Sequence, residues 1–310
     1  MAQSNGRIER LGLIAKPTGV PWHLSHCQTP FAQPLGDDRC RIHFAARDER
    51  NRSRGGWVEV RLGNGGLETV RLAPRPSLDI GRLGAFDDAG AMPSCLIEAE
   101  GRLLLYYTGW TLGGTVPFHF HIGLAASSDG GETFERVSEA PVLGRNRHDP
   151  LVTASAWVLR ENGAFRMWYL SGTAWVAGET GQPVHYYTVK HATSADGMAW
   201  ETNDDLCLPY REGEYAVARP VVRHTESGYR MIFCSRRHGE TYRVYTAASA
   251  DGIAWKRDPE PLLDVAAAGW DSEMVCYASE VSLRNRHFLL YNGNAYGRDG
   301  FGAAELHAPV

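Results

Sequence analysis

One short motif recurs three times along this chain and constrains its fold more than any other feature. The pattern Ala-x-Ser-x-Asp-Gly occupies positions 125–130, 192–197 and 247–252. An aromatic residue follows each copy: Phe134, Trp200 and Trp255. Asp-Gly favours a tight hairpin because Gly adopts positive φ readily and the Asp side chain can bond within its own turn. We therefore predict three hairpins, each with an aromatic side chain covering the sheet from the outer strand.

A second element, a β-rich run ending in small or polar residues, precedes each hairpin. These runs lie at 103–109, 165–172 and 229–235, and two more, without the hairpin, lie at 41–46 and 288–293. Strand, strand, hairpin and strand in regular repetition is typical of propeller blades. No helical pattern persists long enough to compete with it. The sequence predicts an all-β chain that forms one five-bladed β-propeller domain over 1–310.

The last of the five units lacks an outer strand. The chain ends soon after the segment 300–306, so the missing strand has to come from elsewhere. The N-terminal segment 7–14 is the candidate, and its pairing would close the ring. A β-sandwich with chance similarity between its segments is the alternative, but three copies of the motif with a following aromatic are difficult to obtain by chance.

Charge and hydropathy exclude two classes of partner. Lys plus Arg number 32 against 36 for Asp plus Glu, and the net charge is −4 without a run of either sign. Nucleic-acid-binding proteins usually carry a basic face, so we expect no nucleic-acid partner. The mildly apolar N-terminus contains Arg7, Glu9 and Arg10, unlike a secretion signal, and no run is long enough to span a membrane. We expect no membrane association.

The six cysteines are scattered and form no C-x-x-C pair. Several lie in apolar, strand-like segments, such as Cys234 at the end of 229–234. Such cysteines behave as reduced core thiols rather than disulfide partners or zinc ligands. The chain is therefore predicted to be cytoplasmic.

Acidic residues precede the expected innermost strand in four of the five units. They lie in the segments 86–90, 147–150, 214–220 and 270–274. Because the innermost strands of a propeller surround its axis, we expect Asp87, Asp149, Glu214, Arg219 and Glu273 to face one funnel.

This organisation resembles the five-bladed glycosidase superfamily, which includes β-fructosidases, the α-L-arabinofuranosidase/β-xylosidase group and mannoside phosphorylases. His148-Asp149-Pro150 is similar to the Arg-Asp-Pro element of the β-fructosidases, with His in place of Arg. The chain also resembles uncharacterised glycosidase-like bacterial proteins that carry Phe-Asp-x-x-Gly, Ala-Arg-Pro and Tyr-Asn-Gly-Asn-x-Tyr-Gly-x-x-Gly-Phe-Gly, the last found here at 291–302. The resemblance implies a propeller that processes glycosides.

Glycoside cleavage uses two carboxyl groups, one protonated and one ionised. Crowding acids in an aromatic funnel would raise the pKa of some of them, so that one stays protonated near neutral pH. We predict Asp149 and Glu273 as this catalytic pair, with Asp87 as a third acid that orients or tunes them. The alternative is that Asp87 and Asp149 cap turns beside Gly90 and Pro150, and that Glu273 is solvated at a blade edge.

Further residues are predicted to contact the sugar. Arginine can bind a ligand carboxylate or phosphate through two parallel hydrogen bonds, or it can pair with a protein carboxylate instead. An exposed indole can stack on a sugar ring, although a Trp is as often buried. The predicted contacts are Asp88, His148, Glu214, Arg219, Arg236, Tyr277, Trp110, Trp175 and Asn292.

Two patterns suggest other functions and are set aside. His119 and His121 alternate as two ligands on one strand face would, but polar residues on any strand face alternate in this way, so no metal or other cofactor is predicted. The segment 127–134 satisfies the Asp-box pattern of sialidases, which have six blades and three substrate-binding arginines. Since five units are countable here, we interpret this hairpin as scaffold.

Three functions remain open at this point. The first is a glycosidase or transglycosidase, with a carbohydrate as ligand. The second is a glycoside phosphorylase that holds phosphate with Arg219, Arg236, Arg237 or His238. The third is a non-catalytic carbohydrate-binding propeller, because fold alone does not determine function. The number of carboxyl groups in the pocket discriminates between them.

Overall fold

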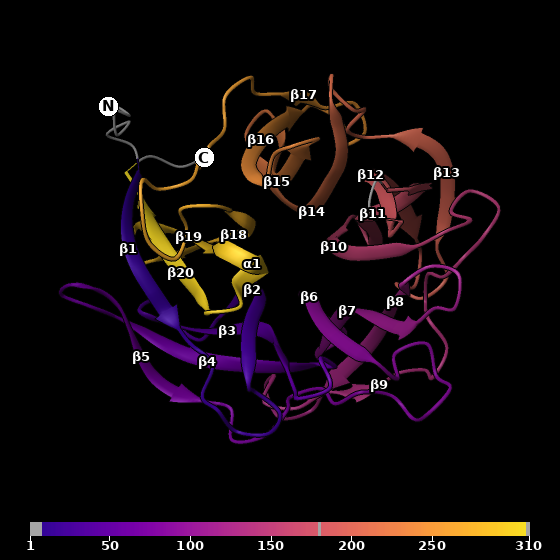
Figure 1. Ribbon diagram of the computed structural model, residues 1–310. Coiled ribbons are helices and arrows are strands. Elements are labelled where there is room, and N and C mark those ends of the chain that lie inside the picture. The colour runs from indigo at the N-terminus through magenta and orange to yellow at the C-terminus, as the bar shows by residue number, and fades with distance from the viewer. Residues whose placement is uncertain (1–7, 179–180, 308–310) are drawn as a thin grey trace.

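The computed structural model describes residues 8–178 and 181–307 and is almost entirely β. These residues form twenty strands and a single one-turn helix, α1 (Asn294–Gly297). Figure 1 shows the strands arranged around a central axis, with β2, β6, β10, β14 and β18 nearest to it. No helix in the described ranges is both long and apolar enough to cross a membrane.

The strands form three sheets. The first has the order β2 (Ser25–Pro34), β3 (Arg39–Arg47), β4 (Ser53–Gly63), β6 (Gly90–Ala99), β7 (Arg102–Leu112), β8 (Phe118–Ser127) and β9 (Glu135–Arg136), with β5 (Gly66–Leu72) paired to β4. The second has the order β10 (Thr153–Glu161), β11 (Ala164–Ala177), β12 (Pro183–Ser194), β14 (Glu214–Thr225), β15 (Gly228–Arg237), β16 (Arg243–Ser249) and β17 (Lys256–Arg257), with β13 (Glu201–Leu206) paired to β12. The third has the order β1 (Ile8–Ala15), β20 (Phe301–Leu306), β19 (Arg286–Asn292) and β18 (Cys276–Leu283).

Nearly all the pairing is antiparallel. Each eight-stranded sheet contains one parallel contact of a single residue pair, Ser53 with Gly90 in the first and Tyr187 with Ala216 in the second. Each contact divides its own sheet into two four-stranded halves, and the two halves follow each other in the sequence.

The pairing predicted for the N-terminal segment is present in the described part of that segment. β1 runs antiparallel to β20, from Ile8 opposite Leu306 to Ala15 opposite Phe301. Arg7, the first residue of the predicted segment, lies outside the described residues. The first and last strands of the chain are therefore hydrogen-bonded neighbours (Figure 1).

The three repeated motifs form the predicted turns. In each copy the Ser hydroxyl donates to the Asp carboxylate, as Ser194 does to Asp196 at 3.0 Å. The same carboxylate accepts backbone N–H groups two to four residues ahead, so the side chain holds its own turn together. Phe134 is buried, and Trp200 and Trp255 are partly buried against core clusters, as expected for covering aromatics.

The apolar core lies between neighbouring sets of strands rather than at the axis. Phe44 and Val58 of the first sheet pack in one cluster with Leu290 and Phe301 of the third. All six cysteines are buried and free, in agreement with the prediction of core thiols.

Candidate functional site

Each of the five strands next to the axis is interrupted by a β-bulge. The register shifts fall at Gln28/Phe31 in β2, Pro93/Cys95 in β6, Ala154/Trp157 in β10, Ala218/Val221 in β14 and Cys276/Ser279 in β18. A bulge re-aims a side chain that would otherwise alternate between the faces of the sheet. The first residues enclosed by the five shifts are Thr29, Ser94, Ser155, Arg219 and Tyr277.

Four of these bulge residues have a left-handed backbone. The φ angles are 54° for Thr29, 50° for Ser155, 56° for Arg219 and 55° for Tyr277. Such a conformation costs a residue with a side chain about 1–3 kcal/mol and tends to occur at functional sites. The surrounding contacts compensate for this cost: the N–H of Thr29 donates to Asn292 Oδ1 at 2.8 Å, and that of Ser155 to Thr108 Oγ1 at 2.9 Å.

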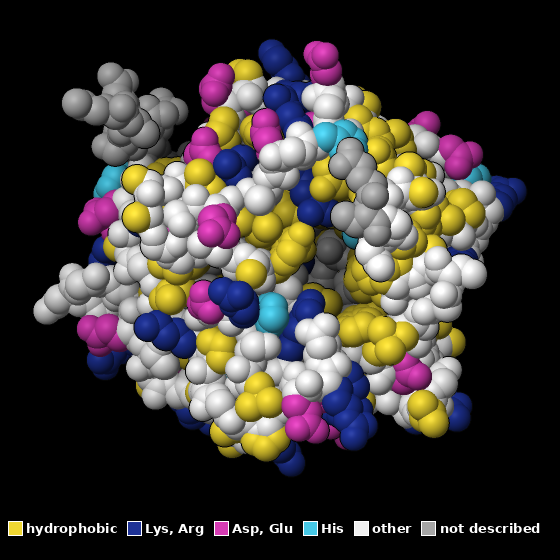
Figure 2. Space-filling view, in the orientation of Figure 1, with side chains coloured by type: hydrophobic (Ala, Val, Ile, Leu, Met, Phe, Trp, Pro, Cys, Tyr) yellow, Lys and Arg dark blue, Asp and Glu magenta, His cyan; other side chains and the backbone are white. Residues whose placement is uncertain are grey.

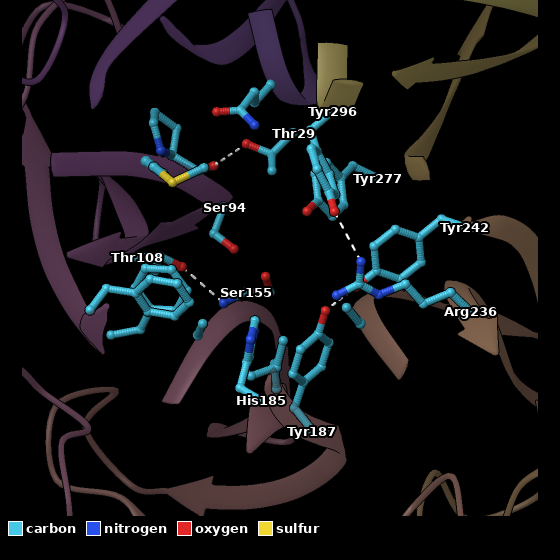
Figure 3. Close-up of a pocket in the computed structure, with 18 of the residues that line it drawn as sticks. Thr29, Ser94, Thr108, Ser155, His185, Tyr187, Arg236, Tyr242, Tyr277 and Tyr296 are labelled. Carbon is cyan, nitrogen blue, oxygen red and sulfur yellow. Dashed lines mark hydrogen bonds between the residues drawn. The ribbon is translucent and has the colours of Figure 1, made fainter. Parts of the chain in front are cut away.

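The bulges border a cavity of about 290 Å³. Figure 2 shows a hollow near the centre of this face of the molecule, and Figure 3 shows side chains from many strands converging on it. The cavity is close to the lower limit of typical ligand pockets, roughly 300 Å³, which suits a small ligand. It is lined by Gln28, Thr29, Arg47, Met92, Pro93, Ser94, Thr108, Phe118, Phe120, Ala154, Ser155, Leu170, His185, Tyr187, Ala218, Arg236, Tyr242, Tyr277 and Tyr296.

Tyrosines surround Arg236 on one side of the cavity (Figure 3). The guanidinium carbon of Arg236 lies 4.9 Å from the ring centroid of Tyr242, and Nη1 donates to the Tyr296 hydroxyl at 2.9 Å. The hydroxyl groups of Tyr187 and Tyr242 hydrogen-bond to each other. His185 packs on Tyr187, with ring centroids 4.5 Å apart. The result is a wall of aromatic faces and hydroxyl groups held around one cation.

Burial keeps Tyr187, Tyr242, Tyr277 and His185 neutral. It raises the pKa of Tyr187, Tyr242 and Tyr277 above the usual tyrosine range. It lowers the pKa of His185 to about 4, with the nearby charge of Arg236 as a further cause. Near neutral pH these groups therefore offer hydrogen bonds without charge, and the arginines carry the charge of the cavity.

Comparison with known proteins identifies relatives and similar folds. No family profile matches the chain. The proteins Rv1502 and MT1551 of two Mycobacterium tuberculosis strains, both described as uncharacterised, are 38% identical to it over 300 residues, covering 96% of this chain and 98% of theirs. This chain belongs to the Rv1502 family.

Solved structures similar to this Rv1502-family protein are glycoside hydrolases. A protein described as glycoside hydrolase superposes with a TM-score of 0.77 at 17% identity, covering 97% of this chain and 92% of the other. A glycosyl hydrolase from Bacteroides ovatus gives 0.74 at 14% identity, with coverages of 97% and 93%. A thermostable family-43 glycoside hydrolase gives 0.67 at 15% identity, with coverages of 96% and 97%. The chain therefore shares its fold with these glycoside hydrolases, as the sequence resemblance predicted.

The cavity of the Rv1502-family protein does not contain the carboxyl groups predicted as catalytic. None of Asp87, Asp149 and Glu273 lines it, and no other Asp or Glu does so within the described part of the chain. Glu273 is exposed, and the contact made by its N–H group is with Asn294 Oδ1. These three acids therefore lie outside the lining of this cavity, and their assignment as catalytic residues stays a prediction.

Asp87 and Asp149 are engaged in structural contacts instead. The Tyr107 hydroxyl donates to Asp87 Oδ2 at 3.0 Å, and Arg136 ion-pairs with the same oxygen at 2.6 Å. Asp149 accepts from the Tyr169 hydroxyl at 3.0 Å and from Ser171 Oγ at 2.6 Å, and Lys190 Nζ lies 3.5 Å away. The alternative of a structural role for these two acids is therefore favoured.

The same arrangement recurs at two more acids. Asp271 accepts from the Tyr291 hydroxyl and pairs with Arg10 of β1. Glu214 accepts from Ser235 Oγ and pairs with Arg257 of β17 at 2.6 Å. Three of the acids lie ahead of an inner strand, and Glu214 is the first residue of β14. Each acid joins this end of the inner strand to the second strand of its group and, except for Asp149, also to the outermost strand.

Three of the predicted sugar contacts lie at the cavity or directly behind it. Arg236 and Tyr277 line it. Arg219 is fully buried behind Ser94 and Thr29, and its Nη1 donates to the Ser94 carbonyl oxygen at 2.7 Å. All three side chains therefore lie at or next to this cavity, and their contact with a sugar stays a prediction.

The remaining predicted contacts are not lining residues. Asn292 is buried and positions Thr29 through its amide oxygen, and Trp175 packs edge-on against Phe118, with ring centroids 5.4 Å apart. Trp110 is buried against Gly90, where a Cβ atom would collide with the indole. The other three predicted contacts are bound to other parts of the protein. Asp88 accepts a hydrogen bond from the N–H of Gly84. His148 pairs with Asp204, and Glu214 pairs with Arg257.

Sequence reasoning missed most of the lining residues. Thr29, Ser94 and Ser155 lie inside strands, where a polar residue gives no separate signal, and their role depends on the bulges. Tyr187 and Tyr242 read as ordinary core aromatics. No cluster of three or more potential metal ligands is found over 8–178 and 181–307, and His119 and His121 are held near Arg145.

Proposed function

We propose that this Rv1502-family chain is a carbohydrate-binding five-bladed β-propeller, one domain over 1–310, whose axial cavity holds a small sugar. Support for the blade count comes from the strands, which fall into five consecutive groups of four. Each group starts with a bulged inner strand. In the last group β1 supplies the outer strand, so the proposed ring closes where the two ends of the chain meet.

The observation that carries the proposed function is the wall of Tyr187, Tyr242, Tyr277 and Tyr296 around the cavity. Aromatic faces suit the apolar C–H faces of a sugar ring, and hydroxyl groups suit its polar edge. Thr29, Ser94 and Ser155 add further hydroxyl groups from β2, β6 and β10 (Figure 3). A pocket with many hydroxyl groups between aromatic rings is better adapted to a sugar than to an apolar ligand.

Binding is proposed ahead of hydrolysis because of the residue types present. Glycoside hydrolysis with two carboxyl groups needs both beside the scissile bond. The described lining residues provide neither, so Asp149 and Glu273 would have to reach the sugar by a rearrangement of their present contacts. Phosphorolysis and transglycosylation need a general acid at the same place, and they rank lower for the same reason.

Support for a cytoplasmic location comes from the thiols. All six cysteines are free and buried, an arrangement suited to a reducing compartment. A location outside the cell would expose these thiols to oxidation whenever the chain opened.

The proposal is tested by titration calorimetry with a panel of methyl glycosides, together with an assay for turnover of aryl glycosides. We expect saturable binding of at least one sugar, loss of that binding in Tyr242→Ala, and no turnover. The control is Tyr210→Ala, which removes a tyrosine that does not line the cavity. Turnover that is abolished by Glu273→Gln would replace the binding proposal with catalysis, and failure of every sugar to bind would refute it.

A further inference from the structure

The charges around the cavity are unbalanced. Arg47 of β3 and Arg236 of β15 line it, and Arg219 lies behind two of its lining residues. None of the three forms an ion pair with an Asp or Glu among the described residues. Other arginines with largely buried side chains do form such pairs: Arg41, Arg54, Arg136 and Arg257. Over residues 8–178 and 181–307, the cavity is therefore a cationic region without a counter-ion from the protein.

Arg219 is the most unusual of these three side chains. It is 1% exposed, lies between the rings of Phe31 and Trp157, and its Nε has no hydrogen-bond partner. Its other nitrogens donate to the carbonyl oxygens of Ser94 and Thr29 and to Ser94 Oγ. Burial lowers the pKa of Arg219 to about 10, so the guanidinium stays protonated near neutral pH. A buried charge without a paired acid is costly, and it persists where it has a use.

The two lining arginines are held by neutral groups. Arg236 donates to the Tyr296 hydroxyl and stacks on Tyr242, and its Nε has no hydrogen-bond partner. Arg47 donates to Gln28 Oε1 at 2.9 Å and to Asn51 Oδ1 at 2.7 Å. These contacts fix the direction of both guanidinium groups without neutralising them, which preorganises them for an incoming anion.

The other titratable groups of the wall do not supply the missing negative charge. Tyr187, Tyr242 and Tyr277 are protonated near neutral pH because burial raises the pKa of each. His185 is neutral there and adds no charge of either sign. An anion placed in the cavity would thus meet the charges of Arg47 and Arg236 directly, with the charge of Arg219 behind Ser94 and Thr29.

We infer that the sugar bound by this cavity carries an anionic group, a carboxylate or a phosphate, which is recognised by Arg47 and Arg236 in the field of Arg219. The inference rests on the proposed function and specifies the class of its ligand. A carboxylate on the sugar ring or a phosphate ester would each fit the planar donors of a guanidinium.

Titration calorimetry with matched sugar pairs tests this inference. Methyl glucoside is compared with methyl glucuronide, methyl galactoside with methyl galacturonide, and glucose with glucose 6-phosphate. In at least one pair we expect the anionic member to bind roughly tenfold to hundredfold more tightly, the range for a charge-assisted hydrogen bond, with the difference reduced at high salt. The pair that shows the effect separates a carboxylate ligand from a phosphate ligand.

Variants assign the effect to the cavity. Arg236→Gln and Arg47→Gln should each abolish most of the preference, measured as the ratio of the affinities for the anionic and the neutral member of a pair, and Arg236→Lys should restore part of this ratio. Arg237→Gln is the matched control, because it removes the same charge from the adjacent, exposed position of the same strand.

Neutral and anionic members binding equally in every pair would overturn the inference while leaving sugar binding intact. Failure of all members to bind would overturn both.

Discussion

The hydroxyl group of Tyr169 donates to Oδ2 of Asp149 at 3.0 Å, across twenty residues of chain. The same donor, acceptor and separation recur in Tyr107 with Asp87 and in Tyr291 with Asp271. A repeated contact of this kind belongs to the scaffold, since a catalytic site occurs once per molecule. Asp87, Asp149 and Asp271 therefore each join the segment ahead of an inner strand to the second strand of the same repeating unit.

Asp149→Asn should destabilise the fold and leave sugar affinity unchanged. The amide no longer balances the charge of buried Lys190, and we expect a loss of about 1–3 kcal/mol of unfolding free energy. Urea unfolding measures this loss, with Glu273→Gln as an exposed control that should unfold like the parent. A variant that kept its stability but lost turnover of a sugar substrate would instead identify Asp149 as catalytic.

Removal of residues 1–14 should lower the melting temperature sharply. The deletion removes most of β1, leaves the edge of β20 unpaired and separates Asp271 from Arg10 Nε, 3.0 Å away. Differential scanning calorimetry measures the effect. An unchanged melting curve would show that the pairing of β1 with β20 contributes little to stability.

Arg10→Met tests the ion pair of that strand alone. Asp271 is buried and would lose its cation, so we expect a loss of about 1–3 kcal/mol. Arg61→Met is the matched control, because the pair of Arg61 with Glu68 is more than half exposed at both ends and should contribute close to nothing. Equal effects in the two variants would contradict this explanation.

Tyr296→Phe should weaken sugar binding by roughly threefold to tenfold, the value of one hydrogen bond. The substitution keeps the ring but removes the hydroxyl group that accepts from Arg236 Nη1 at 2.9 Å, so the guanidinium loses its fixed direction. Calorimetric titration of the tightest sugar measures the change, with Tyr210→Phe as the control. Unaltered affinity would mean that Tyr296 does not position Arg236.

Stability should fall as the pH is lowered from about 6.5 towards 4. Burial, as the largest cause, lowers the pKa of His23, His121, His185 and His191 to about 4, below the usual value of 6.5 that applies to the unfolded chain. In this window the unfolded chain binds more protons than the folded one, and each such histidine removes up to about 1.4 kcal/mol per pH unit. Urea unfolding at several pH values measures the slope, and His185→Gln should reduce it by the share of one histidine. A flat profile would show that these side chains are protonated in the folded protein.

Local sequence determined the repeating units of this protein. The Ala-x-Ser-x-Asp-Gly turns are held by bonds between residues two to four apart, so their chemistry is contained in the motif itself. The strands, the core aromatics and the free thiols follow from hydropathy in the same way, and the pairing of β1 follows from the unit that ends without an outer strand.

The site was decided by tertiary structure. Asp149 and Thr29 both precede or lie within an inner strand, yet the fold directs Asp149 towards Tyr169 and places Thr29 at the cavity. The difference arises from bulges that change side-chain direction without a local signature, and from partners such as Asn292, which meets Thr29 across 263 residues of chain. Contacts between residues far apart in the sequence therefore determine which polar side chains face the cavity and which hold the strands together.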